Sequence, residues 1–312
     1  MDGQEKDLNM ASLDARGVGL FLGLTLGGGY VLQLALLLTG VLDPFEPGFF
    51  GYVAIAAIVL WPGAATLLAR QWAPLDQDSA GYAIWPLPTV NTLRIVATVP
   101  VIFLVANLIA WIPGWTAPDW RMTKMVHLVK QAATQPLPAE VDPMLPAVML
   151  VGGLGFSILL GILFYAPLLF GMEYAFRGYL LPKLSPLGKW FSVALAAAGP
   201  FLYGVPFVVY SHVVAPEALD DLPESLFRLF AITFSSGLLL GILWNHTRHL
   251  GLIAILAGSI VAHVYGIWDS LFAMQHYWFT GSTGLIAAIL WGLLAAYPKA
   301  FVNLPREVRT EL

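Results

Sequence analysis

The chain has 312 residues, of which 58% are hydrophobic and 11% are charged, and it carries a formal net charge of −4. A soluble domain has roughly 25% charged residues, so this chain lacks the polar groups needed to cover a water-facing surface. The negative charge and the scattered basic residues argue against a nucleic-acid partner. The chain has no cysteine, which excludes disulfides and thiolate metal sites. We therefore expect an integral membrane protein whose first partner is the lipid bilayer.

Eight apolar stretches are long enough to predict transmembrane helices. In chain order they are residues 18–42, 49–69, 93–112, 147–169, 190–210, 227–244, 250–268 and 283–301. The fourth stretch continues through Pro167 to Leu181, which is longer than a bilayer requires and predicts a tilted or kinked helix. We find no internal repeat and no linker, so the sequence predicts one all-α transmembrane bundle over residues 1–312.

The segments between the predicted spans differ in character. Residues 71–92 are rich in Pro and Asp and predict an irregular loop. Residues 113–146 predict an outer loop with a short helix over 119–131, because Met122, Met125 and Val129 fall on one helical face. Such an amphipathic helix is expected to lie in the membrane interface.

The basic residues predict the orientation of the chain. With the N-terminus inside, eleven Lys and Arg residues fall on the cytoplasmic side and four fall on the outer side. The polar N-terminal segment, residues 1–16, has four acids and two bases, which is not the pattern of a secretory signal. We expect both termini to be cytoplasmic and the protein to lie in a bacterial inner membrane.

Ionisable residues at membrane depth are costly and mark candidate sites. Glu173 and Arg177 are four residues apart near the end of the fourth span, where they form either a structural ion pair or a catalytic carboxylate held by its arginine. His263 lies within the seventh span, where it is either hydrogen-bonded to a neighbouring helix or serves as a metal ligand or proton carrier. His212 falls at the outer end of the fifth span.

Two further patterns lie outside this group. His246 and His249 flank a turn that also contains Arg248, and we expect them to be solvated. The small-residue spacings Gly23/Gly27 and Gly237/Gly241 predict close helix packing, either within this chain or with another.

The segment Gly171-Met-Glu-Tyr-Ala-Phe-Arg-Gly178 resembles the Glu-Glu-x-x-Phe-Arg-Gly signature of the CPBP intramembrane proteases. These are CaaX-processing and bacteriocin-processing enzymes, also called Abi proteins. Residues 179–190 have the family's spacing between its first and second motifs, and residues 237–263 are similar to the stretch that leads to its third motif. The resemblance covers residues 147–268, and eight spans match the family's architecture.

The resemblance implies a site in which two glutamates, two histidines and an asparagine converge on a polar cavity and activate water. In this chain the first glutamate is replaced by Met172 and the second is Glu173. The histidine of the Phe-x-x-x-His motif is replaced by Val205, and the third motif keeps His263 but has Ile267 in place of its asparagine. His212 substitutes for the missing histidine only if the fifth helix runs seven residues out of register.

These replacements favour a degenerate member of the family. A thioether cannot take a proton from water, and one imidazole with one carboxylate falls short of the three protein ligands that a catalytic zinc normally has. We therefore expect no metal and no cofactor, and an inactive pseudoenzyme that binds other transmembrane proteins, a lipid or a pigment as an accessory subunit. The alternative hypothesis is a working endopeptidase that uses Glu173, His212 and His263, and we expect a bound zinc only in that case. A small-molecule transporter is the third hypothesis.

Overall fold

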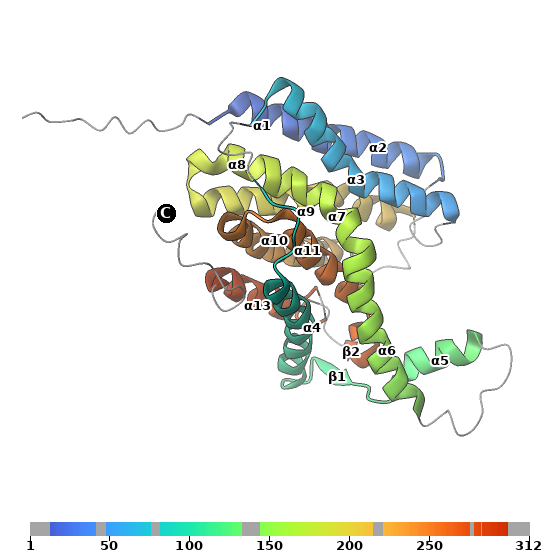
Figure 1. Ribbon diagram of the computed structural model, residues 1–312. Helices are drawn as coiled ribbons and strands as arrows, with labels where there is room; N and C mark the ends of the chain where they lie inside the picture. Colours follow the sequence, from blue (N-terminus) through green and yellow to red (C-terminus); the bar gives the residue numbers. More distant parts are fainter. Residues whose placement is uncertain are drawn as a thin grey trace, which may run out of the picture.

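The protein is a bundle of membrane-spanning helices (Figure 1). The computed structural model describes residues 13–41, 48–75, 82–132, 144–214, 221–274, 278–281 and 283–298. Within them, six helical segments are long and apolar enough to cross a membrane: Ala15–Leu38, Phe49–Trp72 (α3), Thr89–Trp111 (α4), Leu145–Leu187, Lys189–Val214 (α9) and Leu222–Thr247 (α10). Leu250–Val264 (α11) and Leu285–Ala296 (α13) are shorter apolar helices.

All eight predicted stretches contain helix, and the first six are confirmed as segments of spanning length. The last two helices have 15 and 12 residues. A helix needs about 17 to 25 residues to cross the hydrocarbon core, so these two are short for a full crossing. The structure therefore confirms an all-α membrane bundle, and the number of eight spans stays a prediction.

The first segment is made of α1 (Ala15–Leu22), a π-helical turn (Gly23–Gly27) and α2 (Gly28–Leu38). Asp14 caps its beginning, because the carboxylate accepts a hydrogen bond of 2.8 Å from the Gly17 amide. The segment packs along α3, where the Trp61 indole donates to the Leu24 carbonyl at 3.0 Å. A Cβ added to Gly23 or Gly27 would meet no described atom within 4 Å, so this spacing is not a packing contact within the described part of the chain.

The fourth segment is one continuous helix of 43 residues from Leu145 to Leu187. It contains α6 (Leu145–Leu160), a π-helical turn (Gly161–Tyr165), α7 (Ala166–Glu173), a π-helical stretch (Tyr174–Leu180), α8 (Leu181–Leu184) and a 3₁₀ turn (Ser185–Leu187). At about 1.5 Å per residue such a helix would be roughly 65 Å long, twice the hydrocarbon thickness of about 30 Å. It changes direction near α7, in agreement with the predicted tilt or kink (Figure 1).

Close contacts between backbones hold the middle of this long helix in place. A Cβ on Gly63 of α3 would lie 2.8 Å from the Cα of Gly171, so the two helices meet where neither carries a side chain. On α11, a Cβ on Gly258 would lie 2.5 Å from the backbone nitrogen of Ala166. Small residues thus let α3 and α11 approach α7 closely, which fixes the position of the motif that follows.

The two ends of the bundle are closed differently. At the end where α1 begins, which we call the α1 end, Ala83 bridges α10 and α11: its amide donates to the Arg248 carbonyl at 2.9 Å, and its carbonyl accepts from the Leu250 amide at 2.7 Å. At the opposite end, strands β1 (Thr116–Pro118) and β2 (Phe272–Met274) pair antiparallel beside α12 (Trp268–Leu271). The predicted short helix of the outer loop is present as α5 (Thr123–Ala132).

Candidate functional site

The segment that resembles the CPBP signature lies where α7 passes into the π-helical stretch Tyr174–Leu180, and every residue of that stretch is buried. Glu173 is 3% exposed and Arg177 is 1% exposed. The Arg177 Nη1 donates to the Glu173 Oε1 at 3.3 Å and lies 3.2 Å from Oε2. In the part of the chain that the structure describes, Glu173 Oε2 and Arg177 Nε have no hydrogen-bond partner. The carboxylate is therefore neutralised by its own helix.

A cavity of about 160 Å³ lies beside this pair, and we call it the motif cavity. The long helix contributes Leu169, Met172, Glu173 and Arg177 to its wall, and the rest, which is mostly aliphatic, comes from α9, α10, α11 and Tyr265 at the end of α11. Three hydroxyl groups line the wall, those of Thr233, Ser236 and Tyr265. Thr233 donates to the Leu229 carbonyl and Ser236 donates to the Ile232 carbonyl, so both are already used within α10. The ion pair is thus the main polar feature of an otherwise apolar cavity.

His263 lies on a different face of α11 and is not part of the wall of the motif cavity. Its ring is fully buried and stacks on Phe103 of α4, with ring centroids 6.0 Å apart and planes 6° apart. The Trp268 ring lies 6.3 Å away. Nδ1 is 2.9 Å from the Ser259 carbonyl, and Nε2 has no hydrogen-bond partner among the described residues. The imidazole is enclosed by aromatic rings and does not meet Glu173 in a shared cavity.

Val205 and Ile267, which the resemblance places at two replaced positions, do not line the motif cavity. Val205 is half-buried on α9. Ile267 is buried three residues beyond the end of α11, where it packs on Gly153 and lines a separate cavity of about 370 Å³. Of the predicted set, the structure brings together Met172, Glu173 and Arg177.

His212 lies near the end of α9 with its Nδ1 2.8 Å from the Val208 carbonyl. It is twelve residues beyond Pro200, the α9 residue in the wall of the motif cavity. At about 1.5 Å per residue this separates the two by roughly 18 Å along the helix axis. His212 is therefore placed away from Glu173. The described residues contain no group of three or more His, Asp or Glu side chains positioned to hold a metal ion.

The expectation that His249 is solvated is wrong. Its side chain is buried and caps the beginning of α11, where Nδ1 accepts a hydrogen bond of 3.2 Å from the Leu252 amide. Nε2 lies 2.8 Å from the Pro86 carbonyl, so the ring also holds the connection between α3 and α4. The signal in the sequence was its place directly before an apolar helix, which is where a capping side chain is needed.

Comparison with known proteins gives no matching family model and no matching curated protein. The class that the structure defines is an all-α integral membrane protein with a small, mainly apolar cavity beside a buried ion pair.

Proposed function

We propose that the chain is a CPBP-like membrane protein without peptidase activity, which binds a transmembrane helix of a partner protein and serves as an accessory subunit of a membrane complex. The observation that carries the proposal is the composition of the motif cavity. Met172 stands where the resemblance expects the first glutamate, and Glu173 is held by Arg177. The cavity therefore offers a partner an apolar surface.

The chemistry of hydrolysis supports this choice over a working endopeptidase. Cleavage of a peptide within lipid needs a base or a metal to generate hydroxide and a donor to stabilise the oxyanion. A base must lie within hydrogen-bond reach of its water or of a neighbouring group that completes the site. Glu173 meets an arginine here, and His263 is stacked on Phe103 away from it. The pairing of Glu173 with Arg177 and its separation from His263 support the proposal that the chain does not activate water for hydrolysis.

The size of the motif cavity points to the kind of partner. Its volume of about 160 Å³ is below the roughly 300–1,000 Å³ that is usual for a site that encloses a whole small molecule. It has room for one bulky side chain of a helix that packs against the bundle. Helices in a membrane associate through such packing, because lipid tails are as apolar as the side chains they meet.

The charges at the two ends support an N-terminus in the cytoplasm of a bacterial inner membrane. Among the described residues, the α1 end has six Lys or Arg residues and one acid: Arg16, Arg70, Arg94, Lys183, Lys189, Arg248 and Asp14. The opposite end has four bases and three acids whose side chains the structure describes: Arg121, Lys124, Lys130, Arg228, Asp119, Asp221 and Glu224. An excess of Lys and Arg marks the cytoplasmic side.

The proposal is tested by filling the motif cavity. Val261 lies in its wall, whereas Val151 is 72% exposed on α6 and does not line it. We expect Val261→Phe to reduce the amount of a membrane protein that is isolated with the tagged full-length chain in mild detergent by at least about tenfold, and Val151→Phe to leave it unchanged. Quantitative mass spectrometry of the isolated complexes measures both. Equal amounts with both variants would overturn the proposal.

A peptidase assay is the second test of the proposed function. The purified chain is incubated with a prenylated peptide and with a leader peptide, next to an active intramembrane protease as the positive control. We expect no cleavage above background for the natural chain. Cleavage that disappears in Glu173→Gln would establish the endopeptidase instead, since that variant removes the surviving carboxylate of the motif.

A further inference from the structure

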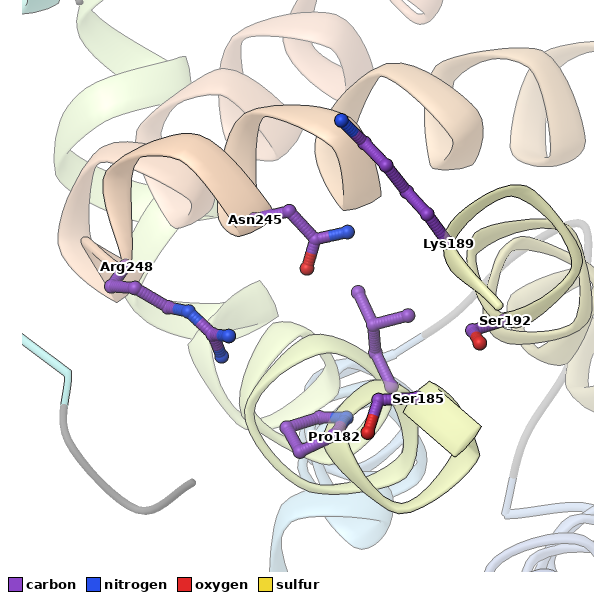
Figure 2. A pocket seen from close by; sticks show the side chains of 7 residues that line it. Pro182, Ser185, Lys189, Ser192, Asn245 and Arg248 are labelled. Carbon is purple, nitrogen blue, oxygen red and sulfur yellow. The ribbon is translucent and has the colours of Figure 1, made fainter. Parts of the chain in front are cut away.

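A second pocket lies at the α1 end of the bundle, and we call it the basic pocket. It has a volume of about 240 Å³ and is lined by Leu181, Pro182, Ser185, Lys189, Ser192, Asn245 and Arg248. The residues come from the end of the long helix, the beginning of α9 and the end of α10. In Figure 2 Asn245 lies between Arg248 and Lys189; the Arg248 side chain points toward the middle of the pocket, and the Lys189 side chain rises toward α10 at its rim.

The charge of this pocket is wholly positive. Lys189 and Arg248 line it, and no Asp or Glu does. In the described part of the chain neither cation forms an ion pair; Arg248 instead lies over the Trp244 ring at 5.8 Å. The Asn245 amide adds a neutral group that can donate hydrogen bonds. Two cations and an amide around a small concavity are suited to an anion with several acceptor oxygens.

The backbone at Arg248 provides an independent reason to look for a role of its side chain. Arg248 ends α10 in the left-handed conformation, with φ 48° and ψ 30°. Glycine or asparagine adopts this conformation at lower cost, and one of them usually occupies the position at the end of a helix. The arginine at this position is therefore uncommon, and its side chain lines the basic pocket.

The surface beside the basic pocket is apolar and faces outward. Trp190 and Phe191, which follow Lys189 in the first turn of α9, are 59% and 58% exposed, and Leu195 one turn further is 40% exposed. Exposed aromatic residues at the end of a membrane helix are typical of the interface, at the level of the lipid headgroups. An anion in the pocket would thus lie next to a surface that acyl chains can cover.

We propose that the basic pocket binds a phosphate group, and that the phosphate belongs to an anionic phospholipid of the surrounding membrane. Lys189 and Arg248 neutralise the phosphate, Asn245 donates to one of its oxygens, and the acyl chains lie along Trp190 and Phe191. Basic pockets between transmembrane helices on the cytoplasmic side are suited to such headgroups. This inference does not depend on the proposed accessory role, because the basic pocket and the motif cavity share no residue, and it takes from the proposed function only the cytoplasmic location of the α1 end.

The experiment measures lipid binding to the purified full-length chain by native mass spectrometry, with phosphatidylglycerol and phosphatidylcholine as probes. The variant Lys189→Gln/Arg248→Asn removes both cations, and asparagine suits the left-handed backbone at position 248. The control Arg16→Gln/Arg94→Gln removes the same charge from two exposed residues of the α1 end that do not line the pocket. Size-exclusion profiles and circular dichroism verify that both variants are folded.

We expect phosphatidylglycerol to bind the natural chain more tightly than phosphatidylcholine, and the pocket variant to lose about 20- to 30-fold in affinity, roughly fivefold per cation. The control should lose less than about threefold. Equal losses in both variants, or no loss in the pocket variant, would overturn the proposal. Inorganic phosphate separates the two sources: a lipid site releases little phosphatidylglycerol to millimolar phosphate. Complete displacement by phosphate would show that a soluble phosphate is the ligand, which overturns the assignment to a lipid.

Discussion

Arg177 and Arg248 line two different cavities of the same bundle, and they differ in their exposure to solvent and in whether an acid lies beside them. Arg177 is 1% exposed, lies within the membrane segment and is paired with Glu173. Arg248 is exposed at the α1 end and faces no acid in its pocket. A buried arginine without its carboxylate would be very costly, whereas an exposed one can exchange water for a ligand. We therefore expect Arg177 to contribute to stability and Arg248 to contribute to the binding of an anion.

The largest expected effect tests the buried member of this comparison. Arg177→Met leaves the Glu173 carboxylate buried and unpaired, so we expect a loss of about 3–5 kcal/mol of stability. The double variant Glu173→Gln/Arg177→Met removes both charges and should recover at least half of that loss. Arg248→Asn is the matched control, with a change within about 0.5 kcal/mol. Unfolding in mixed micelles with increasing denaturing detergent measures all three; a fully stable Arg177→Met would contradict the structural role of the pair.

The next effect compares two buried histidines whose contributions to stability the sequence alone does not predict. His263→Phe keeps the stacking on Phe103 but removes the Nδ1 contact with the Ser259 carbonyl. It also removes a buried Nε2 that has no partner among the described residues, so the two effects offset and stability should change by less than about 1 kcal/mol. His249→Phe removes the cap of α11 and should lose roughly 1 kcal/mol.

Thermal unfolding monitored by tryptophan fluorescence compares the two variants in one detergent. A larger loss of thermal stability for His263→Phe than for His249→Phe would contradict this expectation and would show that the His263 imidazole makes a stabilising interaction.

The smallest effect comes from an ion pair at the surface. Lys183 bonds to Asp14 and holds the pKa of that carboxyl below its usual value of 3.8. The stabilisation is present above pH 3.8 and is lost as the pH falls through the lower pKa of the folded state. Asp14 is 40% exposed, so we expect a few tenths of a kcal/mol and at most about 1. The stability difference between the natural chain and Asp14→Asn should therefore shrink as the pH falls through the lowered pKa of the folded state; a difference that does not shrink with acidification would contradict the assignment.

Composition and hydropathy were enough to predict the class of fold, because a chain with 11% charged residues has few ways to avoid water other than spanning a membrane with helices. The small-residue spacings were less reliable. Gly237 and Gly241 do pack closely on α9, against Ala197 and Val193, whereas the equally spaced Gly23 and Gly27 meet no neighbour among the described residues. Spacing predicts where a helix has a groove, and only the tertiary arrangement decides whether another helix enters it.

The candidate site was predictable in part. The pairing of Glu173 with Arg177 followed from their separation by four residues, which places both on one face of a helix. The position of His263 did not follow, because the face of α11 that meets α4 depends on how two distant segments pack. The basic pocket was missed because its two cations are 59 positions apart in the sequence, and the turn that brings Arg248 to the pocket has a left-handed backbone that an arginine does not indicate.

The continuous helix from Leu145 to Leu187 contributes to three cavities: Gly153 and Ser157 to the one near Ile267, Met172 and Glu173 to the motif cavity, and Leu181 and Ser185 to the basic pocket. Because one continuous, bent helix forms part of each wall, the three spaces lie along a single segment of the chain. A substitution that shifts the position of this helix would therefore be felt in more than one of the three walls.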